Sequence, residues 1–542
     1  MINITARTKR LMTGIVLVWS VLPFLWIVAN RPFNDIFVAR TVADVKLSLN
    51  SGGHLQFLWG AENHPSLEAL VLVLSQFFSI DPQVLQFVPI GGVLRFVMLF
   101  ALARRLLQSS VLGALVASSA AFDYSFGISV NTIFTHAFGS ALYFSFLFVY
   151  LMLLRKKSLN AYVLLVVVFV GAYFFSYVSA VWMIALLGFV LLIGYAQKLV
   201  GRRRDDSTIQ VVGPSLFLAF FVAFVAFNQI IYQAYFVNFL QRDYSLVVIR
   251  FLSGIIAPPN QAALTYRAPT IWPLTALNII YTAFLVFVPA IFLAAPVFRR
   301  TRLGGRSAMD PKTRVLFTAM ILSALLDSTL YFLYGFLDLK YVSIMFPLLS
   351  AGILHHSGVV ERKPNGIANV PYEKKFEASE PWRRETIVTL LVIALVLMNL
   401  GRFGLAIQSN NFSRFSNTNA TPSSEWLLSH FQGSPAVLAD MSTLGKLDMY
   451  ASGLNRTVTE RFYDPFWFEY VVTPGRDSGV NLAEYANFLM IDQQASTLGT
   501  DTQLWSVLPP LGPQVANLNA HPDLALVYTE GAVVIYAVQR TS

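Results

Sequence analysis

The chain has 542 residues, of which 56% are hydrophobic and only 13% are charged. A soluble domain carries about 25% charged residues, so this composition excludes an ordinary water-soluble protein and favours a chain embedded in a bilayer. The net charge of +10 arises largely from short Lys/Arg clusters beside apolar runs, the pattern of the positive-inside rule rather than that of a nucleic-acid-binding surface. There is no cysteine, so disulfides, thiolate catalysis and cysteine-based metal sites are excluded.

Apolar runs of spanning length recur along the first three quarters of the chain, and they predict a polytopic α-helical membrane protein with about 11 transmembrane helices. We expect these spans at 11–29, 84–102, 110–124, 135–154, 160–176, 178–198, 213–233, 273–297, 313–334, 341–355 and 386–404. No small-residue cleavage site follows the first run, which we interpret as a signal anchor that stays in the protein. Nearly every basic cluster falls on the side of the N-terminus. The sequence therefore predicts a multi-pass protein of the cell membrane with a cytoplasmic N-terminus and an extracytoplasmic C-terminus.

The loop 30–83, between the first two spans, is unusually polar and is predicted to lie outside the cytoplasm. Its residues from Asp35 to Leu49 place apolar side chains at helical spacing, which predicts an amphipathic helix on the membrane surface. A second helix, predicted from Pro65 to Phe78, is apolar but short, and we interpret it as re-entrant or interfacial. A concentrated polar loop in an otherwise apolar chain is where we expect the chemistry.

The composition changes at about residue 408, which divides a transmembrane domain, 1–407, from a small extracytoplasmic α/β domain, 408–542. A Ser/Asn/Thr-rich linker, 409–424, comes first. Helices are then predicted at Ser424–Phe431 and Thr443–Ser452, and strands at Ala436–Ala439, Leu524–Tyr528 and Ala532–Val538, the last two as a hairpin. Three glycosylation sequons, at Asn411, Asn419 and Asn455, agree with an outside placement.

Three short motifs carry a resemblance to a known family. They are Asn34-Asp35, Glu62-Asn63-His64-Pro65-Ser66-Leu67, and Ala103-Arg104-Arg105-Leu106 at the end of the second span. In this order they resemble the GT-C class of membrane glycosyltransferases, and in pattern the protein O-mannosyltransferases and the lipid A aminoarabinose transferases. Lys340-Tyr341 is similar to the basic-aromatic element of that family. The C-terminal segment beginning VLADMSTLGKLDMYASG is similar to the outer domain of archaeal members.

The resemblance implies a GT-C-like fold that transfers a sugar, a mannose-like hexose, from a polyprenyl- or dolichyl-phosphate carrier to an extracytoplasmic glycan or protein acceptor. The expected partners are therefore the lipid-linked donor, the acceptor and membrane lipids, with no nucleic acid. Inverting sugar transfer needs a base for the proton of the acceptor and a group that stabilises the leaving phosphate. Asp35, at the outer end of the first span, is the best-placed carboxylate for the base. The alternative is a solvated helix N-cap.

Glu62 and His64 stand two residues apart on the outer loop, where they can bind a divalent metal ion (Mg²⁺ or Mn²⁺) or the donor phosphate. Two ligands do not define a metal site, and the His-Pro pair also suits the start of a helix. Lys340 and Arg242 are the outer cations best placed to hold the phosphate, with Tyr341 beside the lysine. The alternative is that both cations reach lipid headgroups.

Four ionisable side chains lie in apolar runs, where such groups are functional candidates by default: Arg95, Asp123, His136 and Asp327. Asp123 is a site candidate, or it pairs with Arg95 and fixes the packing of two spans. Asp44, within the first predicted helix of the outer loop, is a further candidate.

A second class of function stays open: a non-catalytic polytopic membrane protein, either a transporter or a pseudo-transferase subunit of a cell-envelope complex. The GT-C pattern has adjacent acids where this chain has Asn34-Asp35, which keeps an inactive homologue open. A transporter is expected to have repeated halves, and the sequence shows no such repeat. The gathering of polar residues on the outer side favours the transferase.

Overall fold

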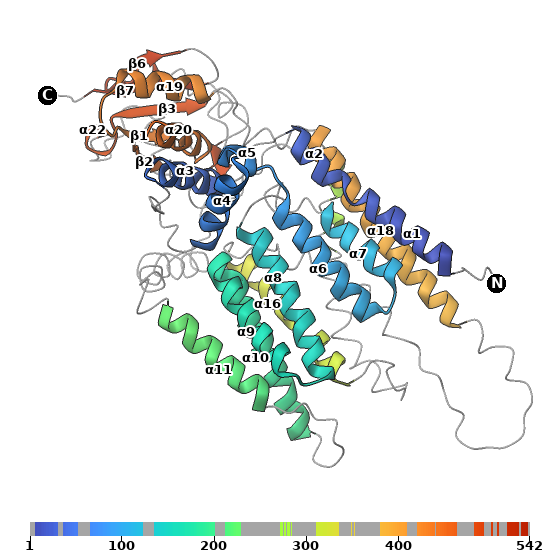
Figure 1. Cartoon of the computed structure of the whole chain (residues 1–542). Coiled ribbons are helices and arrows are strands. Elements are labelled where there is room, and N and C mark those ends of the chain that lie inside the picture. Colours follow the sequence, from blue (N-terminus) through green and yellow to red (C-terminus); the bar gives the residue numbers. More distant parts are fainter. Residues whose placement is uncertain are drawn as a thin grey trace, which may run out of the picture.

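The fold is that of a computed structural model. The structure describes residues 6–30, 36–52, 65–122, 135–200, 212–228, 272–274, 276–277, 279–281, 283, 311–334, 348–349, 352, 380–408, 420–439, 441–462, 482–492, 500–501, 507–508, 518–529 and 533–539. Figure 1 shows long helices side by side in a bundle, with a small α/β domain at one end of it. The described residues therefore include parts of both regions, the one before and the one after the change of composition at residue 408.

The bundle is built from ten described helices. They are α1 (Ala6–Trp19), α2 (Leu22–Asn30), α6 (Ile90–Leu107), α7 (Ser110–Ala121), α8 (Thr135–Arg155), α9 (Leu159–Phe175), α10 (Tyr177–Val200), α11 (Val212–Ala226), α16 (Pro311–Tyr334) and α18 (Glu380–Gln408). Within the described ranges, four segments are long and apolar enough to cross a membrane: Arg7–Asn30, Pro82–Leu107, Ala137–Arg155 and Val178–Ala196. Several expected spans, including 273–297 and 341–355, fall wholly or largely outside the described residues, so the predicted total of 11 stays a prediction.

The first expected span is divided in two. α1 ends at Trp19 and α2 begins at Leu22, whereas the apolar run 11–29 predicts one uninterrupted helix. Pro23 explains the division, because it has no N–H to donate to the carbonyl of residue 19 and its ring clashes with that carbonyl. α9 and α10 follow the apolar runs closely, whereas α6 begins six residues after the start of the expected span 84–102 and ends five residues after its end.

Aromatic residues supply most of the largest fully buried side chains among the described residues. Phe169 of α9 and Phe221 of α11 stack with their ring centroids 3.7 Å apart. α8 approaches the junction of α9 and α10 so closely that a Cβ on Gly139 would lie 2.2 Å from Oγ of Ser179. Only glycine fits there, because any side chain would overlap the neighbouring helix.

The C-terminal domain contains a five-stranded sheet in the order β2-β1-β3-β7-β6. Its strands are β1 (Ala436–Ala439), β2 (Thr459–Phe462), β3 (Phe488–Asp492), β6 (Leu524–Tyr528) and β7 (Val533–Val538), and its helices are α19 (Ala420–His430), α20 (Met441–Gly453) and α22 (Leu482–Tyr485). β1 is parallel to β2 and β3, and β7 is antiparallel to β3 and β6. A separate pair, β4 (Thr500–Asp501) and β5 (Val507–Leu508), is antiparallel. The predicted hairpin is confirmed as β6–β7, and α19 begins four residues before its predicted start.

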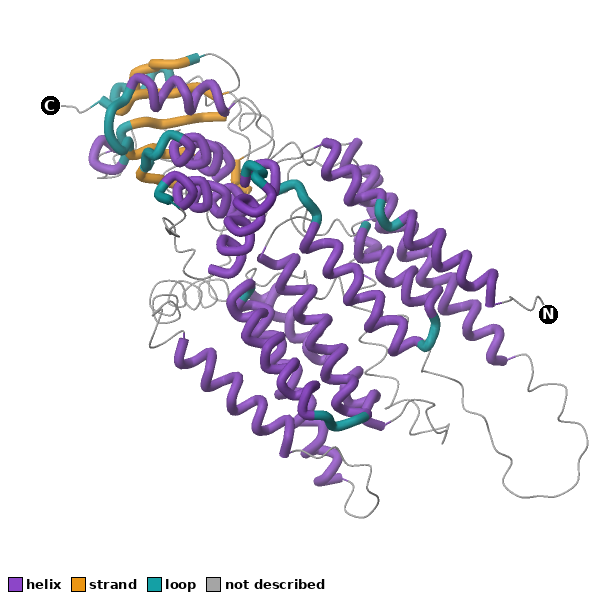
Figure 2. The backbone as a smooth tube through the Cα atoms, in the orientation of Figure 1, coloured by secondary structure: helices purple, strands orange, loops and turns teal. Residues whose placement is uncertain are grey.

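Three short helices connect the bundle to this domain: α3 (Ile36–Asn50), α4 (Pro65–Phe78) and α5 (Pro82–Leu85). α3 packs against α4 on one side and against α20 on the other (Figures 1 and 2). Val42, Ala43 and Val45 on α3 are at most 1% exposed. The helix predicted for residues 35–49 therefore exists, but it is enclosed between two other helices rather than lying open on a membrane surface.

Candidate functional site

Most predicted site residues lie outside the described part of the chain: Asp35, Glu62, His64, Asp123, Arg242, Lys340 and Tyr341. Asp44 is the one that the structure describes. The sequence still relates two of the others to described elements. Asp35 directly precedes Ile36, the first residue of α3, and His64 directly precedes Pro65, the first residue of α4. α3 packs against α4, so the two helices that adjoin these candidates in the sequence are in contact.

Asp44 of α3 faces Glu68 of α4 in a buried carboxyl pair. The two residues are 2% and 3% exposed. Burial, the negative charge of Asp44 and a side-chain hydrogen bond with Asp44 together raise the pKa of Glu68 from 4.5 to about 9. At neutral pH the two carboxyls therefore share one proton. The hydrogen bond between them joins α3 to α4, and the site does not hold two adjacent negative charges. Sequence reasoning missed Glu68, although a single acid in the apolar segment LEALVLVL was a usable signal.

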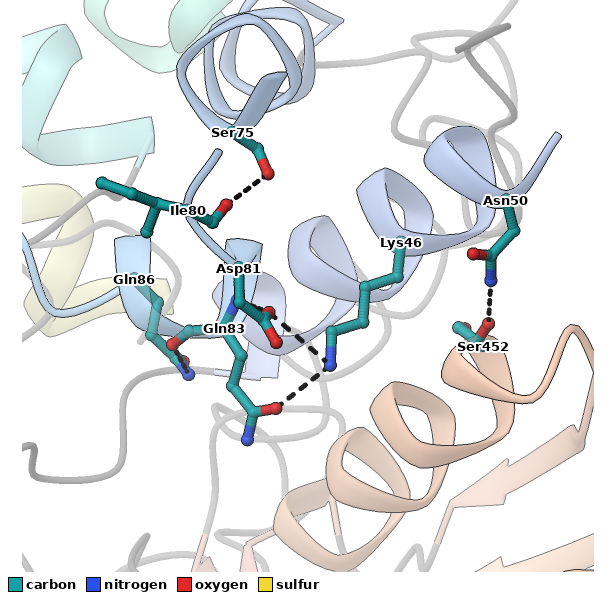
Figure 3. Close-up of polar contacts among 8 residues, drawn as sticks. All are labelled: Lys46, Asn50, Ser75, Ile80, Asp81, Gln83, Gln86 and Ser452. Atoms are coloured by element: carbon teal, nitrogen blue, oxygen red, sulfur yellow. Dashed lines mark hydrogen bonds and ion pairs between the residues drawn. The ribbon is translucent and has the colours of Figure 1, made fainter. Parts of the chain in front are cut away.

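Lys46 connects α3 to the segment that follows α4 (Figure 3). Its Nζ donates a hydrogen bond of 3.0 Å to Oε1 of Gln83 and lies 3.8 Å from Oδ1 of Asp81. Asp81 is the N-cap of α5, where its Oδ1 accepts a hydrogen bond of 2.7 Å from the backbone N–H of Gln83. The ion pair is partly exposed, so its main effect is to fix the register between α3 and α5 rather than to add much stability.

One turn further along the same face, α3 contacts the C-terminal domain. The amide Nδ2 of Asn50 donates to the carbonyl oxygen of Ser452 in α20, as Figure 3 also shows. Met449 of α20 forms a small buried cluster with Val42 and Ala43 of α3. One helix of the outer loop is thus held by an apolar cluster and by polar contacts from three other helices.

A second polar cluster lies within the bundle, around the C-terminal end of α7. The guanidinium of Arg95 donates to the carbonyl oxygen of Ala120 at 3.1 Å. This contact places a cation at the negative end of the α7 dipole. Pairing of Arg95 with Asp123, which would fix the packing of two spans, is one of the two alternatives that the sequence leaves open for that acid. The contact with Ala120 agrees with a packing role, while Asp123 lies outside the described residues.

The same end of α7 is bound by α18. Nδ2 of Asn399 donates to both the carbonyl oxygen and Oγ of Ser119, each at 3.0 Å. Arg402, one turn later, donates to Oδ1 of Asn399 at 2.9 Å, and its guanidinium lies 4.2 Å from the centroid of the Tyr281 ring. Arg402 is only 4% exposed, and a cation in an apolar run was the signal that could have indicated it.

The described residues do not by themselves form a metal site. Among them, no group of three or more His, Asp or Glu side chains could hold a metal ion. The Asp44–Glu68 pair offers two carboxyls, but the raised pKa of Glu68 keeps a proton where a cation needs a free carboxylate. We therefore derive no step that passes through a metal.

No family model matches the chain, and a search of curated proteins finds no match. Among solved structures, the chain is similar to the oligosaccharyltransferase of Archaeoglobus fulgidus in the apo form, with 13% identity, a TM-score of 0.48, and coverage of 98% of this chain and 75% of that one. It is also similar to ArnT from Cupriavidus metallidurans. For the form bound to undecaprenyl phosphate the identity is 12% and the TM-score 0.46, with 97% and 98% of the two chains covered. For the apo form these values are 13%, 0.47, 97% and 97%. At these identities and TM-scores, the likeness carries no functional conclusion.

Proposed function

We propose that the protein is a membrane glycosyltransferase that transfers a sugar, a mannose-like hexose, from a polyprenyl- or dolichyl-phosphate carrier to an extracytoplasmic glycan or protein. The observation that carries the proposal is the fixed position of α3, the helix that begins directly after Asp35. α3 is enclosed by α4 and α20, and polar contacts from Glu68, Gln83 and Ser452 hold it. A catalytic residue benefits from such rigid support, because a small displacement of its side chain lowers the rate strongly.

The proposed reaction is an inverting displacement at the anomeric carbon of the donor sugar. The acceptor hydroxyl oxygen forms the new bond to this carbon, while the bond from the carbon to the phosphate oxygen breaks. Asp35 takes the hydroxyl proton, and the leaving polyprenyl phosphate keeps the electron pair of the broken bond. Lys340 and Arg242 offset the negative charge of the phosphate, with His64 and Tyr341 as further contacts.

Asp44 enters this proposal as a positioning residue. It is buried against Glu68, so it acts on the reaction through the position of α3. Asp123, which follows the α7 end bound by Arg95 and α18, remains a second candidate for the donor site.

A divalent cation, Mg²⁺ or Mn²⁺, is proposed at Glu62 and His64. Their carboxylate and imidazole suit Mn²⁺ better than Mg²⁺, which prefers oxygen ligands. Binding of Mn²⁺ to purified protein, followed by electron paramagnetic resonance, tests this independently of activity. A Glu62→Gln variant that binds Mn²⁺ as tightly as the unaltered protein would argue against this site.

The function is tested by transfer of radiolabelled mannose from a synthetic polyprenyl-phosphate mannose to endogenous acceptors in membranes. We expect transfer by the unaltered protein and a loss of about 10²- to 10⁴-fold in Asp35→Asn, the usual effect of removing a general base. Glu425→Gln, which removes an exposed acid from α19, is the matched control and should retain transfer.

Equal activity of Asp35→Asn and the unaltered chain would exclude Asp35 as the base. Absence of transfer from every polyprenyl-linked donor, with the folded protein present in the membrane, would favour the alternative of a non-catalytic polytopic protein, such as a pseudo-transferase subunit.

A further inference from the structure

An open cleft of about 470 Å³ lies where the outer-loop helices meet the C-terminal domain. Its lining residues come from three places: α3, the end of α4 with the turn into α5, and the last residue of α20. They are Lys46, Leu49, Asn50, Ser75, Gln76, Ser79, Ile80, Asp81, Pro82 and Gly453. The cleft is largely open to solvent, so a ligand would lie along it rather than be enclosed. The cleft is distinct from the buried Asp44–Glu68 pair, neither member of which lines it.

The chemistry of the lining favours an uncharged ligand rich in hydroxyl groups. The only charged side chains of the lining, Lys46 and Asp81, lie 3.8 Å apart and offset each other. A phosphate or another anion would meet no net positive charge there. The remaining polar groups are the amide of Gln76 and the hydroxyl of Ser79, which both donate and accept hydrogen bonds, because Asn50 and Ser75 already donate to the carbonyl oxygens of Ser452 and Ile80.

Ser79 gives a second and independent indication. It has a φ of +53° at the end of α4, a left-handed conformation that usually belongs to glycine. The backbone N–H of Ile80 donates to the carbonyl oxygen of Ser75 at 3.1 Å, which closes the helix end around this residue. A serine is strained here where glycine would not be. The backbone conformation at this position favours glycine. The chain nevertheless has a serine there, whose exposed hydroxyl lines the cleft.

We propose that this cleft binds a short saccharide that forms part of the acceptor. The amide of Gln76 and the hydroxyl of Ser79 bond sugar hydroxyls, the carboxylate of Asp81 accepts from a further hydroxyl, and Leu49, Ile80 and Pro82 contact the C–H faces of the rings. The description of the ligand as an acceptor rests on the proposed function. The binding of a saccharide does not.

The absence of cysteine makes a direct test simple. In the full-length, detergent-solubilised protein, Gln76→Cys places the only thiol of the chain in the cleft, because position 76 is exposed and lines it. Ser429→Cys places one on the exposed surface of α19, as the matched control. The rate of maleimide labelling is measured for each variant with mannotriose, maltotriose, chitotriose or inorganic phosphate. We expect at least one trisaccharide to slow labelling in Gln76→Cys and none to slow it in Ser429→Cys, with phosphate without effect on either.

A second variant tests the contribution of Ser79. Ser79→Gly removes the hydroxyl and relieves the backbone, so it should fold at least as well as the unaltered chain. Added to Gln76→Cys, it should raise the saccharide concentration needed for half-protection by about 2- to 10-fold, the effect of one lost hydrogen bond.

The proposal would be overturned if phosphate, and no saccharide, slowed the labelling of Gln76→Cys, or if no probe slowed it. Equal slowing of labelling at both thiols would also overturn it. So would a saccharide concentration for half-protection that Ser79→Gly leaves unchanged. Because labelling reports binding and the radiolabelled-mannose assay reports transfer, failure of the cleft proposal is distinguishable from failure of the proposed function.

Discussion

The side-chain amide of Asn50 in α3 donates a hydrogen bond of 3.2 Å to the carbonyl oxygen of Ser452 in α20, across 402 positions of the chain. It is the polar member of the contact that also includes Met449, Val42 and Ala43. This contact contributes to the stability of the interface between the C-terminal domain and the outer-loop helices.

Asn50→Ala should loosen this seating without unfolding either part. Loss of one partly buried hydrogen bond weakens a contact by about 1 kcal/mol. We expect faster hydrogen–deuterium exchange at the end of α20 and in α3, with little change in the β-sheet. Asn30→Ala is the matched control, since the bond of its amide among the described residues is to Trp26 within its own helix. Similar exchange in the two variants would mean that Asn50 has no special part in the contact.

Glu68→Gln should change how stability depends on pH. The folded protein keeps the proton of Glu68 up to a pKa of about 9, whereas the unfolded chain releases it near 4.5. The unfolded state therefore binds fewer protons between these values, and the free energy of unfolding falls as pH rises through this window. Glutamine has no proton to lose, so the variant should lack this fall and be more stable above neutral pH by about 1 to 3 kcal/mol.

Thermal unfolding in detergent, at intervals between pH 5 and pH 9, measures this effect. Glu425→Gln removes an exposed acid and should keep the pH profile of the unaltered chain. Parallel profiles for Glu68→Gln and the unaltered protein would contradict the raised pKa.

Gly139→Ala and Gly188→Ala should shift stability in opposite directions. A Cβ at Gly139 would lie 2.2 Å from Oγ of Ser179 and 2.6 Å from Cβ of Ser176, whereas a Cβ at Gly188 meets nothing within 4 Å. Overpacking at the first position should destabilise the bundle by about 1 to 3 kcal/mol. Alanine at the second should stabilise α10 by up to about 1 kcal/mol, since it is the better helix former. The midpoints of thermal unfolding of the two variants give the comparison, and equal midpoints would argue against close packing of α8 at this place.

Asn399→Leu should weaken the contact between α7 and α18. It removes two hydrogen bonds to Ser119 and one accepted from Arg402. Polar contacts between helices in a membrane average about 0.6 kcal/mol each, so we expect a loss of about 1 to 2 kcal/mol. Asn228→Leu serves as the control, because in the described part of the chain its amide bonds Phe224, one turn earlier. The measurement is the concentration of denaturing detergent at which half of the protein unfolds. This concentration should be lower for the Asn399 variant than for the control.

Local patterns in the sequence predict the helices and strands well. α4 (Pro65–Phe78) and β1 (Ala436–Ala439) have the predicted limits, because Pro, Gly and the length of an apolar run act on the residues beside them. The division of the first span at Pro23 was also readable from the sequence, and the expectation of one continuous helix gave too little weight to the missing N–H.

Contacts between distant segments could not be predicted in this way. Nothing in the segment of α3 reveals that α20 will cover Val42, and nothing near Glu68 in the sequence identifies Asp44 as its neighbour. For the outer loop, the sequence predicted both helices, α3 and α4, and named Asp44 as a candidate. The partners that bury Asp44 depend on tertiary packing, which periodicity does not encode. The roles of Asp35, Glu62 and His64 stay predictions for the experiments described above.

The enclosure of α3 also has a consequence for the order of biosynthesis. α3 leaves the ribosome long before α20, its partner 402 positions later at the Asn50–Ser452 contact. Until that segment is translated, Val42 and Ala43 lack the helix that covers them in the finished protein. A chain that ends before α20 would keep this apolar surface open, which is the kind of feature that chaperones and proteases recognise. The C-terminal domain, which is translated late, thus covers the apolar surface of the first outer loop. Until then, that exposed surface distinguishes an incomplete chain from a complete one.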